Sequence, residues 1–97
     1  MTPEQEIHRA TEARLLLDNE TLQAALNAIE AEVVNQWEQC PARDKDGKEA
    51  LWQLLKTSKK FRRLLTGYIE TGNLARENLK RHEESKLARM GRALRRA

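Results

Sequence analysis

The clearest periodicity in this chain lies in LWQLLKTSKKFRRLLTGY, residues 51–68. Its apolar residues recur at alternating intervals of three and four, which is the spacing of a coiled-coil seam. Ser58 interrupts the series, as a packing or register residue does, and Trp52, Leu55 and Ile69 widen it. We therefore expect a long amphipathic helix over residues 47–71. The seam consists of Leu51, Leu54, Ser58, Phe61, Leu65 and Tyr68.

A second apolar stripe precedes this one and predicts a helix over residues 20–39. Leu22, Leu26, Ile29, Val33 and Trp37 are spaced at 4, 3, 4 and 4 and share one helix face. A proline disfavours helical geometry in the residue before it, so the helix should stop before Pro41. Polar residues then form a loop over 40–46, and the next helix starts with Asp46 and Glu49 as a capping box. Two arms of similar length predict an antiparallel helical hairpin.

The chain continues beyond this hairpin on both sides. Thr2 and Gln5 have the spacing of a capping box and predict a short N-terminal helix, which kinks or restarts at Asp18–Asn19. At the other end, we expect Gly72 to terminate the second arm. Residues 1–73 then form the hairpin core, and residues 74–97 form a basic C-terminal helix or flexible arm. Gly67, inside a helix, suggests a close helix–helix approach or is a tolerated accident.

Composition places the protein in the all-α class. The 97 residues are 39% hydrophobic and 34% charged, with four glycines and two prolines. The large apolar residues are too few to enclose a substrate pocket. We therefore expect no enzymatic activity, catalytic residue or cofactor. Cys40 is the single cysteine, and the two histidines lack companions at metal-ligand spacing, so no metal site is expected. Neither a membrane span nor a signal peptide is expected.

Charge is distributed unevenly along the chain. Residues 1–40 carry two basic and eight acidic side chains, residues 41–73 carry eight and four, and residues 74–97 carry eight and three. An acidic arm beside a basic arm favours antiparallel pairing, within one chain or between two chains. Charge alone does not choose between these arrangements.

Two basic clusters are candidate binding sites for nucleic acid or for an acidic protein partner. Binding to nucleic acid would be non-specific, because the sequence has no helix-turn-helix spacing, zinc finger or basic zipper. Solvated surface is the alternative for the first cluster, and a disordered solubilising end for the second. The first cluster is Lys56, Lys59, Lys60 and Arg63. The second is Lys80, Arg81, Lys86, Arg89, Arg92, Arg95 and Arg96.

The apolar stripe also predicts a protein interface. A two-helix hairpin buries too little apolar area to offset its chain entropy, whereas two hairpins can form a four-helix bundle. We therefore expect a homo-oligomer. Trp37 and Trp52 either close the loop end of the hairpin or contact a partner protein. The predicted interface consists of Trp37, Trp52, Leu51, Leu54, Phe61, Leu65 and Tyr68.

Several short motifs give the chain a family resemblance. Leu15–Asn19, the loop Cys40–Asp44 and the turn Ile69–Ala75 resemble small helical proteins encoded among the virion-morphogenesis genes of tailed bacteriophages. The resemblance covers about residues 8–80 and implies a structural or assembly role, in the cytoplasm of the bacterial host or in the virion. The alternatives are a DNA-binding packaging or regulatory protein similar to a small terminase subunit, and a phage inhibitor of a host protein.

Overall fold

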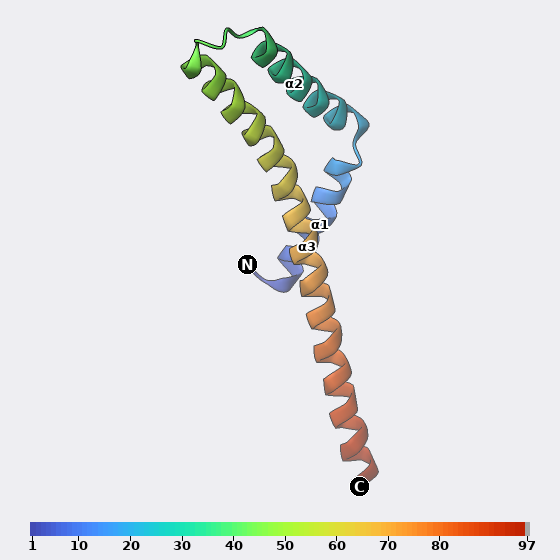
Figure 1. The fold of residues 1–97 in the computed structure, drawn as a ribbon. Coiled ribbons are helices and arrows are strands. Elements are labelled where there is room, and N and C mark those ends of the chain that lie inside the picture. The colour runs from blue at the N-terminus through green and yellow to red at the C-terminus, as the bar shows by residue number, and fades with distance from the viewer. Residues whose placement is uncertain (97) are drawn as a thin grey trace.

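The computed structural model describes residues 1–96 and contains three α-helices. Helix α1 spans Pro3–Leu17, α2 spans Glu20–Gln39 and α3 spans Lys45–Arg96. The all-α prediction is confirmed. Figure 1 shows α1 and α2 beside one part of α3, while the rest of α3 continues alone to the C-terminal end. The molecule is therefore elongated, with extents of 81 × 26 × 17 Å.

Local hydrogen bonds fix the ends of the first two helices. Thr2 and Gln5 form the expected capping box, in which the Gln5 amide donates to Thr2 Oγ1 at 3.2 Å and the Thr2 amide donates to Gln5 Oε1 at 2.9 Å. Asn19 caps α2 by accepting from the Leu22 amide at 2.9 Å, so the chain starts a new helix here rather than kinking. The second helix ends at Gln39, as expected from Pro41.

The beginning of α3 differs from the prediction by two residues. The carboxylate of Asp44, rather than Asp46, accepts the Gly47 amide at 3.0 Å, and the helix starts at Lys45. An aspartate placed before the first helical residue accepts a hydrogen bond from an otherwise unpaired backbone amide. Its negative charge also interacts favourably with the positive N-terminal end of the helix dipole. The loop between α2 and α3 is consequently shorter than expected.

The predicted helix break at Gly72 is wrong, because α3 runs through it without interruption. Gly72 is instead buried against α1 at the closest approach of two helices. A Cβ atom at this position would overlap the Ala10 side chain and lie 2.9 Å from the Glu6 carbonyl oxygen. Only glycine fits there. Gly67, whose added Cβ would meet nothing within 4 Å, is not at a close approach.

Burial in α3 follows a heptad series that is shifted from the predicted seam. Ser58 and Leu65 are buried as expected, but Leu54 and Phe61 are 56% and 44% exposed. Leu54 and Phe61 therefore do not pack within the chain, and their place in a protein interface stays a prediction. The face that packs on α1 and α2 is the one shared by Leu55, Ser58, Arg62, Leu65, Ile69 and Gly72.

The core is small and made chiefly of small side chains. Ala10 and Ala13 of α1 are buried, as are Gly72 and Ala75 of α3. The remaining buried apolar side chains are Leu26, Val33 and Leu65. Among residues 1–96, no helix is long and apolar enough to cross a membrane.

Candidate interaction surfaces

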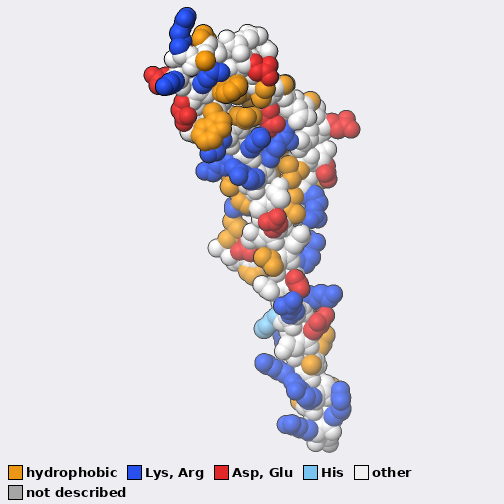
Figure 2. All heavy atoms as spheres, viewed as in Figure 1, with side chains coloured by type: hydrophobic (Ala, Val, Ile, Leu, Met, Phe, Trp, Pro, Cys, Tyr) orange, Lys and Arg blue, Asp and Glu red, His pale blue; other side chains and the backbone are white. Residues whose placement is uncertain are grey.

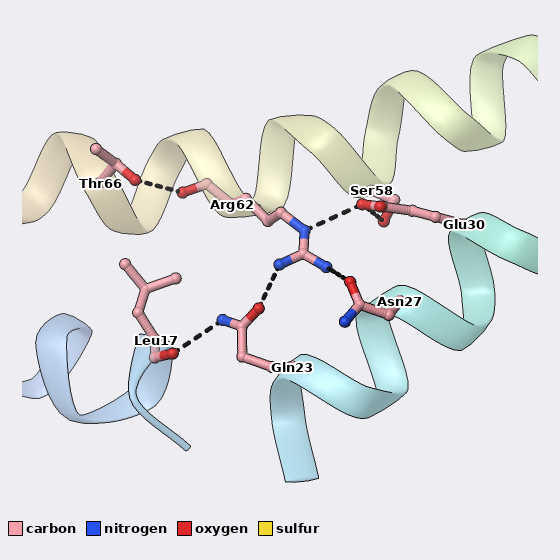
Figure 3. A network of polar contacts seen from close by, with 7 residues as sticks. All are labelled: Leu17, Gln23, Asn27, Glu30, Ser58, Arg62 and Thr66. Atoms are coloured by element: carbon pink, nitrogen blue, oxygen red, sulfur yellow. Dashed lines mark hydrogen bonds and ion pairs between the residues drawn. The ribbon is translucent and has the colours of Figure 1, made fainter. Parts of the chain in front are cut away.

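A polar cluster around Arg62 joins α2 to α3 (Figure 3). Arg62 Nε donates to Glu30 Oε1 at 3.0 Å, and another guanidinium nitrogen donates to Asn27 Oδ1 at 2.9 Å. The third donates to Gln23 Oε1, while Ser58 Oγ donates to Glu30 Oε1 at 3.1 Å. One guanidinium therefore satisfies three side chains of α2. This cluster fixes the register between the two helices.

The same cluster perturbs the ionisation of Glu30. The hydrogen bond from Arg62 lowers the pKa of the Glu30 carboxyl below its ordinary value, against the opposing effect of partial burial. The Ser58 hydroxyl and the positive charges of Arg62 and Lys59 act in the same direction as the bond. Glu30 is thus ionised at neutral pH. Arg62–Glu30 is the one ion pair that joins two helices within residues 1–96.

The first predicted basic cluster lies on one exposed face of α3. Lys56, Lys59, Lys60 and Arg63 are all exposed, and Lys59 also borders a groove between α2 and α3. The Lys56 ammonium also lies 4.0 Å from the centre of the Trp52 ring. Sequence spacing therefore placed these four residues together correctly. What they bind stays a prediction.

The two tryptophans lie at the loop end of α2 and α3. Their side chains are 44% and 45% exposed, and they line an apolar hollow with Val34 and Leu55. Lys48 covers the Trp37 ring at 3.7 Å and donates to the Trp37 carbonyl oxygen at 3.0 Å. The hollow remains open to solvent, because both tryptophans are only half-buried.

A second, more polar groove adjoins this hollow and runs between α2 and α3. Asn27, Ala31, Val34 and Glu38 of α2 form one wall, and Leu55 and Lys59 contribute from α3. Helix α2 carries four glutamates and no lysine or arginine. Two of these glutamates, Glu30 and Glu38, lie on the α2 wall, and Lys59 is the basic residue on the α3 side of the groove.

The second predicted basic cluster lies on the part of α3 that continues beyond α1, residues 77–96, here called the projecting segment. At 1.5 Å per residue, it adds about 30 Å to the molecule. Every residue from 80 to 90 and from 92 to 96 is exposed. Figure 2 shows this end as a narrow rod covered with basic side chains. Its charge is therefore presented to solvent on a helix.

The projecting segment is also amphipathic. Leu87, Met90 and Leu94 recur at intervals of three and four, and their side chains are 65%, 54% and 77% exposed. The last twelve described residues, 85–96, hold five basic and no acidic side chains. An apolar stripe flanked by cations on an isolated helix is unusual for a merely solvated surface. Sequence reasoning found the charges but did not distinguish an ordered helix from a flexible arm.

The loop cysteine is poorly suited to nucleophilic chemistry. Partial burial raises the pKa of the Cys40 thiol, and the Asp44 carboxylate, 3.6 Å from the sulfur, acts in the same direction. Only the thiolate is an effective nucleophile. Cys40 is consequently protonated at neutral pH. Within residues 1–96, no three His, Cys, Asp or Glu side chains are grouped to hold a metal ion.

Comparison of the chain with protein-family profiles, with curated proteins and with solved structures found no match.

Proposed function

We propose that this protein is a non-enzymatic interaction module that associates with copies of itself and presents its projecting segment to an acidic protein partner. The observation that carries this proposal is the continuation of α3 as an isolated basic, amphipathic helix. A helix with an apolar stripe and flanking charges is a common form of recognition element, because it docks into a groove on a partner. The resemblance to phage morphogenesis proteins makes assembly of a virion the proposed setting.

Surface area supports self-association. The chain exposes 7910 Å², whereas a compact monomer of 11.2 kDa exposes about 5,700 Å². The difference exceeds the roughly 800 Å² that each partner buries in a standard protein–protein interface. Exposed side chains of the projecting segment, Leu87, Met90 and Leu94, supply apolar area for such contacts.

The test is a measurement of mass by light scattering at low and high salt, with and without a generic DNA duplex. We would compare the full chain with a tail-neutral variant, in which Lys86, Arg89, Arg92, Arg95 and Arg96 are replaced by Gln. Glutamine keeps helix propensity while removing charge. We expect the full chain to form an oligomer without DNA and the variant to lose it. A monomer of the full chain under all conditions would overturn the proposal.

The second candidate is a DNA-binding packaging or regulatory protein. It is favoured by the shared exposed face of Lys56, Lys59, Lys60 and Arg63, which adds a second cationic surface to the projecting segment. Such binding would be dominated by phosphate contacts and would weaken steeply with salt. A duplex complex that dissolves in salt, and that requires both basic clusters, would support this candidate over the first.

A further inference from the structure

We infer that the acidic partner of the projecting segment is α2 of a second copy of this chain, in a reciprocal dimer. The inference rests on the proposed function and names its partner. Each copy would place Leu87, Met90 and Leu94 along the groove beside α2 of the other, with Val34 as the apolar contact. The flanking arginines would then face Glu20 and Glu38 of α2.

The two surfaces are complementary in charge. Helix α2 has four acidic and no basic residues, and residues 85–96 have five basic and no acidic residues. Within residues 1–96, Glu30 is the one α2 carboxylate in an ion pair, with Arg62. Of the cations in the projecting segment, Arg81 pairs with Glu77 of the same segment. On the groove side of α2, Glu38 and, on the same helix face, Glu20 are in no ion pair within residues 1–96, and neither are the five cations of residues 85–96.

The shape of the chain excludes pairing of these surfaces within one molecule. Helix α3 is continuous from Lys45 to Arg96, and α2 lies along its N-terminal part. The projecting segment points away from α2 and cannot fold back without breaking α3. The attraction between the two can therefore be satisfied only between chains. The sequence alone left this choice open.

The two surfaces also match in size and polarity. Helix α2 has 20 residues, and the projecting segment has the same number, so both are about 30 Å long. Val34 and Trp37 on α2 are 42% and 44% exposed, and Leu87, Met90 and Leu94 are more exposed still. Burying both sets supplies the apolar centre of an interface, with charges at its rim.

Charge argues against the competing arrangement in which two α3 helices pair through Leu54, Phe61 and Leu64. Lys60 and Arg63 flank this stripe, and pairing it with itself would bring two basic faces together. The α2 wall of the groove has the opposite charge. The projecting segment therefore docks on the α2 side, away from Lys59. Reciprocal docking gives a closed twofold dimer, the commonest oligomer.

The test is a charge swap in the full-length chain, followed by sedimentation velocity without nucleic acid. An α2 variant carries Glu20→Lys and Glu38→Lys, at two positions that lie about five turns apart on the helix face of the groove, and it spares the Glu30–Arg62 pair. A tail variant carries Arg89→Glu and Arg92→Glu. We expect each variant alone to dimerise at least about tenfold more weakly, because its surfaces repel one another. We expect an equimolar mixture to recover the dimer, because both interfaces of the mixed dimer are again complementary.

A matched control carries Glu4→Lys and Glu12→Lys on the exposed surface of α1. It changes the net charge as the α2 variant does and should dimerise like the unmodified chain. Recovery in the mixture also shows that both variants are folded. Dimers that survive either swap, or a mixture that stays monomeric, would overturn the inference. If the unmodified chain oligomerises and only the swap fails, self-association stands and this partner surface is wrong.

Discussion

Gly72 is the residue at which adding one carbon atom to the side chain should reduce the stability of the fold most clearly. In Gly72→Ala the new Cβ overlaps Ala10 and the backbone of Glu6, so α1 must move away from α3. We expect a loss of about 1–2 kcal/mol in the free energy of unfolding, because overpacking exceeds the gain in helix propensity. Gly67→Ala is the matched control, since open space surrounds that position, and it should gain up to about 1 kcal/mol. Urea denaturation followed by circular dichroism at one protein concentration measures both. Equal effects at the two glycines would show that α1 does not pack at Gly72.

Glu30 gives a pH dependence of stability with a defined sign. Its folded pKa is lowered by Arg62, so its contribution is complete above the unfolded pKa of about 4.3 and is lost as pH falls through the folded value. We expect Glu30→Gln to cost about 1 kcal/mol at pH 7 and to flatten the loss of stability as the pH falls below about 5. Glu12→Gln is the control, because its pair with His8 is largely exposed. Denaturation midpoints across this pH range make the comparison, and parallel curves for Glu30→Gln and the unmodified chain would contradict the assigned role of Arg62.

Helix α3 is stabilised differently along its length: its first part packs on other helices, and its last part does not. Residues 55–75 pack on α1 and α2, whereas residues 80–96 have solvent around them. We expect the amide protons of residues 80–96 to exchange with little protection in a dilute sample and those of residues 55–75 to exchange slowly, because isolated helical turns open at small cost. Hydrogen exchange by mass spectrometry at two protein concentrations measures this. Protection of the projecting segment should rise at the higher concentration if it docks on a second copy. Strong protection in both samples would contradict its isolation within the chain.

The whole molecule is far from the dimensions of a compact domain of its length. Its radius of gyration is 22.5 Å, against about 13 Å for a compact chain of 100 residues. We expect small-angle X-ray scattering from the tail variant, as a monomer, to give a radius of gyration near the larger value and an elongated distance distribution. The unmodified chain at high concentration serves as the comparison. A value near 13 Å for the monomer would mean that α3 bends or breaks.

By itself, the sequence determined the helices and their chemistry. The capping residues Thr2 and Asn19, the stop before Pro41 and the period of the apolar stripes are local signals, and each specified a helix end or a helix face. The same holds for the shared face of Lys56, Lys59, Lys60 and Arg63, because helical spacing alone sets it.

Only the tertiary structure decided which side of α3 packs and where α3 ends. The predicted seam Leu54, Ser58 and Phe61 and the observed series Leu55, Ser58 and Arg62 share Ser58 and both advance by steps of three and four, so helical spacing alone could not choose between them. The packed side is set by two contacts: Arg62 donates to three side chains of α2, and Gly72 leaves room for Ala10 of α1. In both cases the contacting residues are distant in sequence. A glycine that is surrounded by solvent is typical of a helix end. A glycine that faces another helix instead allows the two helices to come close together. Which of the two applies is a property of the packed molecule.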